Sequence, residues 1–154
     1  MNNACEIIKY CEGFRKSPYK CPSGIWTIGY GSTKIFDKDG KFLHEVSEDT
    51  PDMTKDEALR QLGVHLDNEV TPVLKLVTLA LNTNQTEALK SFVYNIGSGA
   101  FKRSDTLIAL NSGDLKSFEK QFREWRMADG KVLKGLVIRR DIELELFNKE
   151  LKNV

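Results

Sequence analysis

The pattern of the chain changes at Thr54, and this change limits the folds that it can form. Residues 14–46 are rich in β-branched and aromatic residues, and residues 37–40 read Asp-Lys-Asp-Gly, a hairpin-turn signal. From Thr54 onward, apolar residues recur at helical spacing instead. Strands followed by a run of helices are typical of an α+β fold, in which the two kinds of element occupy separate parts of the chain.

Boundary signals divide the helical part into several helices. A capping box at residues 54–57 is followed by an apolar stripe that reaches Val70. Pro72 should end or kink this helix, because proline lacks the amide hydrogen that a helix interior needs. Turns that contain glycine separate the later helices, which we expect over residues 83–96, 104–110, 114–127 and 134–148.

A short helix comes before the strands. Apolar residues at helical spacing predict it over residues 3–11, with an end near Glu12 because Gly13 is a stop signal. A single domain of two lobes follows from these elements, and ligand sites are common between lobes, so we expect a cleft there. In chain order the domain has a small N-terminal lobe with an antiparallel β-sheet (12–53), a long connecting helix (54–76) and a larger all-helical lobe (77–154), on which helix 3–11 packs.

Charge and hydropathy exclude two classes of partner. Lys and Arg number 23 against 22 Asp and Glu, whereas proteins that bind nucleic acid usually carry a clear basic surplus. The longest mostly apolar stretch, near residues 76–81, is too short to span a bilayer, so we expect no stable membrane insertion. The N-terminus has no basic and then apolar region of the kind that directs export. We therefore expect the protein to accumulate in the cytosol unless another component releases it.

The cysteines indicate neither a disulfide framework nor a metal site. All three, Cys5, Cys11 and Cys21, lie in the first 21 residues, and an odd number without an export signal argues against structural disulfides. No spacing of Cys and His suits zinc. We expect no metal and no cofactor.

Glu12 is a candidate general acid because of its position. It lies at the expected C-terminus of the first helix, where the negative end of the helix dipole disfavours a carboxylate. Partial burial also favours the protonated form of a carboxyl group. A carboxylic acid that keeps its proton near neutral pH is what a general acid needs, although an exposed glutamate at a frayed helix end fits the position as well.

The residues that follow Glu12 resemble the signature of the phage-type lysozymes, glycoside hydrolase family 24. That signature is a glutamate, eight residues, an aspartate or sometimes a cysteine, five residues and a threonine, and the chain has Glu12, Cys21 and Thr27 at this spacing. The resemblance covers nearly the whole chain in the family's order. Its further parts are Tyr19, Gly24 and residues 26–31, then residues 84–97 with Phe101, then Trp125, residues 135–136, residues 139–140 and Glu143.

The resemblance implies a lysozyme-like fold and a muramidase, which hydrolyses the β-1,4 bond between N-acetylmuramic acid and N-acetylglucosamine in bacterial peptidoglycan. Members of the family are mostly phage endolysins, and they hydrolyse the bond with inversion of the anomeric configuration. In this mechanism an acid protonates the leaving oxygen while a base activates water on the opposite face of the sugar. By this correspondence Glu12 is the acid, Cys21 replaces the usual aspartate, and Thr27 helps to position the water. Substrate-binding residues are expected at Thr33, Tyr94, Asn95 and Ser104.

Some of these correspondences have structural alternatives. Tyr94 offers a sugar a ring face and a hydroxyl, but its apolar neighbours equally predict a position in the core. Arg139 or Arg140 should neutralise an acid near the cleft, whereas paired arginines on a helix usually lie on a solvated face. Ser32 stands where many members have histidine, so the ion pair of that histidine is not expected.

Cys21 leaves three mechanisms open, because a thiol has a reference pKa of about 8.5 and an aspartate one of about 3.9. A thiolate could replace the carboxylate as base, or a neutral thiol could hold the water in place. Direct attack of the sulfur on the sugar is the third, and it would retain the configuration instead of inverting it. A disulfide from Cys21 to Cys5 or Cys11 would block the group, but a reducing cytosol favours free thiols.

The implied partner is the glycan strand of peptidoglycan, cleaved by a monomer that depends on a holin for release. Two other functions also fit the residues. A peptidoglycan-binding module could keep the fold and lose turnover because cysteine replaces aspartate. A cysteine hydrolase could instead cut the peptide stems. In that case Cys21 would form a thiol–imidazole pair with either His44 or His65.

Overall fold

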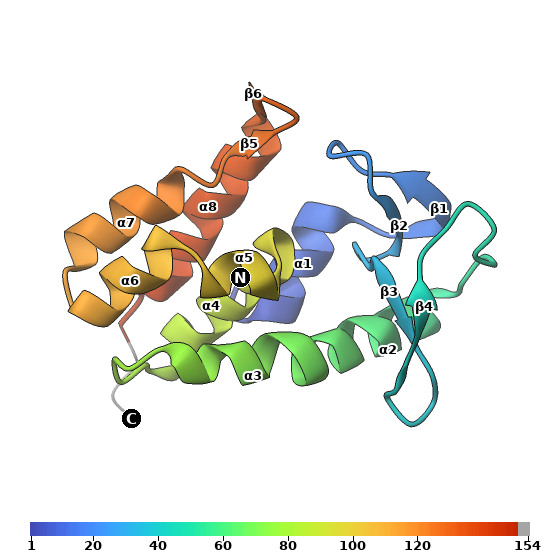
Figure 1. Ribbon diagram of the computed structural model, residues 1–154, viewed down its shortest axis with the longest axis horizontal. Coiled ribbons are helices and arrows are strands. Elements are labelled where there is room, and N and C mark those ends of the chain that lie inside the picture. Colours follow the sequence, from blue (N-terminus) through green and yellow to red (C-terminus); the bar gives the residue numbers. More distant parts are fainter. Residues whose placement is uncertain (151–154) are drawn as a thin grey trace.

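The computed structural model describes residues 1–150 of the chain. Figure 1 shows a group of strands and a group of helices joined by a long helical run. We call residues 13–53, with β1–β4, the strand lobe, and α1 with α4–α8 the helical lobe; the limits expected from the sequence stay a prediction. The strands are β1 (Arg15–Lys20), β2 (Trp26–Gly29), β3 (Lys34–Phe36), β4 (Phe42–Glu45), β5 (Met127–Ala128) and β6 (Lys131–Val132). The helices are α1 (Ala4–Glu12), α2 (Lys55–His65), η1 (Leu66–Val70), α3 (Thr71–Val73), η2 (Leu74–Leu76), α4 (Thr83–Ile96), α5 (Ser98–Lys102), α6 (Asp105–Ser112), α7 (Leu115–Arg123) and α8 (Lys134–Phe147).

The strand lobe contains two small sheets, where the sequence predicted one. β1 pairs with β2 and β3 with β4, both in antiparallel fashion. Between the sheets the chain passes through Gly29 and Gly31, whose φ angles are 66° and 80°. These left-handed positions turn the chain sharply, so that an isolated bridge between Ile28 and Ser32 forms in place of a continuous ladder.

The hairpin predicted at residues 37–40 is confirmed and joins β3 to β4. The carboxylate of Asp37 accepts hydrogen bonds from the backbone N–H groups of Asp39 and Lys41, at 2.8 and 2.9 Å. Gly40 completes the turn with a φ of 80°.

The long helical run begins at a threonine cap. Thr54 accepts a hydrogen bond from the N–H of Glu57 at 3.1 Å, which is half of the predicted capping box. The carboxylate of Glu57 does not complete the box, because it binds Arg60 at 2.7 Å and Gln61 at 2.9 Å instead.

The run continues through Pro72, so this residue does not end the helix; whether it kinks the helix stays a prediction. Leu66–Val70 forms a π-helical turn, in which the N–H of Thr71 bonds to the carbonyl oxygen of Leu66. This wider turn carries the chain into α3, where Pro72 occupies the first turn and needs no amide hydrogen.

The predicted helices of the helical lobe are present, with two differences. The helix expected over residues 114–127 ends at Arg123, and the β5–β6 hairpin follows. Its turn residues Asp129 and Gly130 have φ angles of 51° and 73°, the two positive values of a type I′ turn. In addition, the short helix α5 forms directly after Gly97, where the glycines predicted only a turn.

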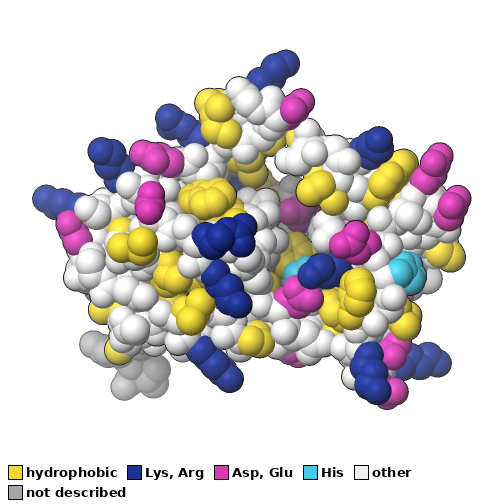
Figure 2. All heavy atoms as spheres, in the orientation of Figure 1, with side chains coloured by type: hydrophobic (Ala, Val, Ile, Leu, Met, Phe, Trp, Pro, Cys, Tyr) yellow, Lys and Arg dark blue, Asp and Glu magenta, His cyan; other side chains and the backbone are white. Residues whose placement is uncertain are grey.

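One apolar core joins the connecting helix to the helical lobe. α1 packs against α4 and α8, and the core includes Ile7 and Ile8 from α1 together with Leu62 from α2 and Phe92 from α4. Figure 2 shows the surface hollowed between the two lobes, as expected. Among residues 1–150, no helix combines the length and the apolarity needed to cross a bilayer.

His65 is partly buried where the strand lobe meets α4. Its ring lies 5.9 Å from that of Phe36 and 5.0 Å from that of Tyr94, edge to face in both cases. Within residues 1–150, its Nδ1 atom is buried without a hydrogen-bond partner. Burial lowers the pKa of His65, although the carboxylate of Glu69 acts in the opposite direction.

We therefore expect the free energy of unfolding to fall as the pH drops below about 6.5, the pKa of an exposed histidine. Below that pH the unfolded chain binds a proton at His65 that the folded chain resists, so protonation favours unfolding. In urea denaturation between pH 7 and 5, His65→Phe should flatten this dependence. His44→Gln, which alters an exposed histidine, should leave it unchanged, and equal pH curves for all three proteins would contradict the assignment.

Candidate active site

Glu12 is the last residue of α1 and is held by a residue from each lobe. Helix α1 ends there because Gly13 takes a φ of 68° and a ψ of 168°. Nη1 of Arg139, on α8, donates to Oε1 of Glu12 at 2.6 Å. On the other side a Cβ placed on Gly31 would lie 2.7 Å from Cδ of Glu12, so the carboxyl group lies directly against the Gly31 backbone. The side chain of Glu12 keeps 22% of its surface exposed.

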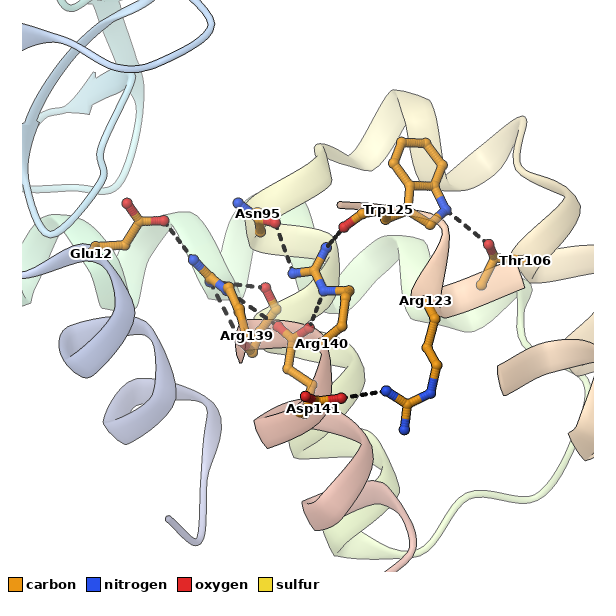
Figure 3. A network of polar contacts seen from close by, with 10 residues as sticks. Glu12, Asn95, Thr106, Arg123, Trp125, Arg139, Arg140 and Asp141 are labelled. Carbon is orange, nitrogen blue, oxygen red and sulfur yellow. Dashed lines mark hydrogen bonds and ion pairs between the residues drawn. The ribbon is translucent and has the colours of Figure 1, made fainter. Parts of the chain in front are cut away.

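A buried network of charges extends from Glu12 into the helical lobe (Figure 3). Nε of Arg139 lies 3.3 Å from Oε2 of Glu143, and Nε of Arg140 lies 2.8 Å from Oε1 of the same carboxylate. Ser91 donates to Glu143 at 2.6 Å. The two arginines and Glu143 expose at most 3% of their side chains, so the alternative of a solvated arginine face is wrong.

The charges of this network act on Glu12 through Arg139. Burial alone would lower the pKa of Arg139, but the carboxylates of Glu143 and Glu12 outweigh it and the pKa is raised. Arg139 is therefore a fixed positive charge in direct contact with the carboxyl group of Glu12.

The backbone of Cys21 and the side chain of Thr27 bind the same carbonyl oxygen. Cys21 follows β1, and its backbone N–H donates to the carbonyl oxygen of Ile25 at 2.9 Å. The hydroxyl of Thr27, in β2, donates to the same oxygen at 2.9 Å. Thr27 is 3% exposed and Cys21 is half-buried. Their shared contact with Ile25 places the two residues at the same end of the β1–β2 hairpin.

Tyr19, in β1, belongs to the same hairpin. It pairs with Thr27 across β1 and β2, and the guanidinium of Arg15 lies 4.3 Å from the centre of its ring. Partial burial raises the pKa of Tyr19, and the charges of Glu12 and Cys21 raise it further. The charges of Glu12 and Cys21 thus both raise the pKa of this phenol, and a shared site for the two residues stays a prediction.

Two of the four predicted substrate residues are buried and occupied by internal contacts. Tyr94 is 9% exposed and donates its hydroxyl to the carbonyl oxygen of Tyr30 at 2.7 Å, which leaves no open ring face for stacking on a sugar. Burial raises the pKa of Tyr94 far above its usual range. Ser104 is 6% exposed and caps α6, where its oxygen accepts from the N–H of Leu107 at 3.0 Å. Helix capping explains Ser104, and the core alternative explains Tyr94.

Thr33 and Asn95 are the other two predicted substrate residues, and both are partly exposed. Oδ1 of Asn95 accepts from Nη2 of Arg140 at 2.7 Å, which places Asn95 at the edge of the charge network. The backbone carbonyl of Thr33 accepts from Val46 at 2.9 Å. Their role in binding substrate stays a prediction.

An ion pair is present close to Ser32, where the resemblance implied a histidine in other members of the family. Ser32 is fully buried, and Nζ of Lys34 pairs with Glu69 of the π-helical turn at 2.9 Å. The backbone carbonyl of Glu69 also accepts from the hydroxyl of Ser98 at 2.8 Å. Lys34, Glu69 and Ser98 therefore connect the strand lobe, the connecting helix and the helical lobe.

All three cysteines are free thiols in the structure. Burial raises the pKa of Cys5 and of Cys11, which keeps these two thiols in the protonated form at neutral pH. Within the described part of the chain, no group of three or more His, Cys, Asp or Glu side chains is placed to hold a metal ion.

Comparison with known proteins decides the family. The sequence model of the family Phage lysozyme matches residues 9–143, which include Glu12, Cys21, Thr27 and Arg139. The chain belongs to the phage lysozyme family. The resemblance seen in the sequence is thereby confirmed.

Several curated relatives of this phage lysozyme family member are endolysins. The endolysin of Bacillus phage B103 is 35% identical over 151 residues, which are 96% of this chain and 54% of the relative. The SAR-endolysin of Bacteriophage PS119 is 35% identical over 135 residues, 88% of this chain and 75% of the relative. The endolysin of Acyrthosiphon pisum secondary endosymbiont phage 1 is 35% identical over 92% of both chains. The chain thus spans about half the length of the first relative and nearly all of the third.

Solved structures confirm the lysozyme-like α+β fold. The muramidase domain of SpmX from Asticaccaulis excentricus superposes with a TM-score of 0.74 and 32% identity, covering 96% of this chain and 95% of that one. The endolysin from Escherichia coli O157:H7 phage FAHEc1 superposes with a TM-score of 0.75 and 28% identity, covering 98% and 94%.

Proposed function

We propose that the chain is a muramidase that hydrolyses the β-1,4 bond between N-acetylmuramic acid and N-acetylglucosamine and serves as an endolysin. The observation that carries the proposal is the setting of Glu12, a partly exposed carboxyl group held between the lobes. Because Arg139 binds Oε1, the other oxygen, Oε2, is the one left to carry a proton to the leaving glycosidic oxygen.

Thr27 and Cys21 act on the water that attacks from the opposite face. The hydroxyl group of Thr27 donates its hydrogen to the carbonyl oxygen of Ile25. The hydroxyl oxygen of Thr27 is therefore available to accept a hydrogen bond from the water. The sulfur of Cys21, at the same end of the hairpin, is the second acceptor. Cys21 serves as base if it is a thiolate and as a water holder if it is a thiol.

Mass spectrometry of the fragments released from purified sacculi tests the reaction. We expect fragments that end in reducing N-acetylmuramic acid. New amino termini, lost after alkylation with iodoacetamide, would indicate a cysteine hydrolase that cuts peptide stems. Intact glycan strands with the protein bound to them would indicate a non-catalytic binding module.

The role of Cys21 has its own pH test. If the thiolate is the base, activity should rise with pH as the thiol ionises, and Cys21→Ser should remove this rise together with most of the activity. Cys11→Ser, at a thiol outside the hairpin, should keep the rise. A pH profile unchanged in shape by Cys21→Ser would favour the water-holding role.

We also propose the cellular setting. The protein acts as a monomer on the cell wall, accumulates in the host cytoplasm, and reaches the wall when a holin opens the membrane. Expression in Escherichia coli with and without a co-expressed holin tests this arrangement, since lysis should require both. Lysis without a holin would contradict it.

A further inference from the structure

The carboxyl group of Glu12 lies in direct contact with the backbone of Gly31. A Cβ at Gly31 would be 2.7 Å from Cδ of Glu12 and 2.9 Å from its Oε2 atom. Distances this short leave no room for any side chain at residue 31. The position of the Gly31 backbone therefore decides where the carboxyl group can be.

The Gly31 backbone is itself held from the helical lobe. The carbonyl of Tyr30 belongs to the planar peptide unit that ends in the amide of Gly31, and it accepts the hydrogen bond from the hydroxyl of Tyr94 at 2.7 Å. Tyr94 is fixed in turn, because it is 9% exposed and packs edge to face on His65 at 5.0 Å. This hydrogen bond thus ties α4 to the peptide unit that touches Glu12.

We propose that Tyr94 is a positioning residue for Glu12, acting through the Tyr30–Gly31 peptide, and is not a contact to the substrate. The inference rests on the proposed role of Glu12 as the acid. Arg139 holds one oxygen of the carboxyl group from α8, and Gly31 limits the other from the strand lobe. Without the Tyr94 hydroxyl the peptide unit can shift, and Oε2 loses its alignment with the leaving oxygen.

The test is Tyr94→Phe, which removes the hydroxyl and keeps the ring. On soluble uncrosslinked glycan strands we expect kcat to fall about tenfold with KM unchanged, since small misplacements of a catalytic group reduce the chemical step. The pH profile of kcat should change on the limb that reports the acid. Tyr10→Phe, at a side chain 66% exposed on α1, should behave as the wild type. An unchanged kcat, or a raised KM with the same kcat, would overturn the proposal.

A second pair of variants tests the contact between Gly31 and Glu12 itself. Gly31 and Gly113 have nearly the same φ, 80° and 81°, but a Cβ on Gly113 meets nothing within 4 Å. Both changes to alanine therefore carry similar backbone strain, and only Gly31→Ala should reduce kcat, by more than tenfold. Gly31→Ala should also destabilise the protein, which is measured as a rise in the unfolding equilibrium constant. This rise should be at least tenfold larger in the wild-type background than in a Glu12→Ala background, where the carboxyl group is gone. Equal effects in the two backgrounds would overturn the contact.

These outcomes are separate from a failure of the proposed function. If Glu12→Gln cleaves normally, Glu12 is not the acid and the proposed mechanism fails. If Glu12→Gln is inactive while Tyr94→Phe keeps its full kcat, only the positioning role fails. Each variant should be assayed well below its own unfolding midpoint, so that activity is measured on folded protein.

Discussion

Replacing Glu12 with glutamine should lower the rate of peptidoglycan cleavage by about 10²–10⁴-fold, the range expected for removal of a general acid. Glutamine has nearly the shape of glutamate and can still accept the hydrogen bond from Arg139, so the fold and the hollow between the lobes should persist. The loss should therefore fall on kcat, while sedimentation with sacculi stays near that of the wild type. The measurement is the rate at which reducing ends appear.

The matched control is Glu6→Gln, the same substitution in the same helix. Glu6 is exposed, and its carboxylate accepts a hydrogen bond from the backbone N–H of Asn2. Its own backbone N–H donates to Oδ1 of Asn3, a bond that the substitution keeps. Full activity in Glu6→Gln would show that the loss of a negative charge on α1 does not by itself explain the lower cleavage rate of Glu12→Gln. A Glu12→Gln protein that keeps more than about a tenth of the wild-type rate would contradict the role of Glu12 as acid.

Arg139→Met should lower the free energy of unfolding by about 3–5 kcal/mol, the cost of removing one partner from a buried ion pair. The guanidinium binds Glu12, Glu143 and the backbone carbonyl of Ser91, and its side chain is 3% exposed. Methionine fills much of the space but leaves two carboxyl groups with one fewer cation. Urea denaturation at neutral pH measures the loss, and cleavage should fall with it because Oε1 of Glu12 is released.

Arg123→Met provides the comparison for this change. Arg123 also pairs with a carboxylate, Asp141, but both side chains are at least half exposed. Exposed pairs contribute about 0.2–1 kcal/mol, so this variant should unfold almost as the wild type does. Equal losses at Arg123 and Arg139 would mean that burial does not set the strength of the network.

Local signals predicted the elements that depend on neighbouring residues. The end of α1 follows from Gly13, the β3–β4 turn from residues 37–40, and α4 from residues 83–96. The errors arise where distant contacts compete with local preference. At Pro72 the π-helical turn removes the need for a break, and at Met127 a turn at residues 129–130 pairs two short strands in place of a last helical turn.

The site could be predicted only in part, for a similar reason. The spacing of Glu12, Cys21 and Thr27 places the last two at one hairpin end, because a hairpin brings its strand ends together. The contacts of Glu12 come from residues 19 and 127 positions further along the chain, and no local rule pairs them. Burial of Tyr94 also depends on the whole fold, which is why its motif suggested a sugar contact and its surroundings show a core position.

The π-helical turn helps to keep the buried line of the connecting helix straight. Ala58, Leu62, Leu66 and Val70 are buried at intervals of four residues. In an α-helix of 3.6 residues per turn, each such step advances about 40° around the axis, so the line would wind away from the core. The π-helical turn Leu66–Val70 has more residues per turn, so it offsets part of this drift in the last of these steps. Deleting one residue there would rotate everything beyond it by about 100°, and with it the face of the helical lobe that meets the strand lobe.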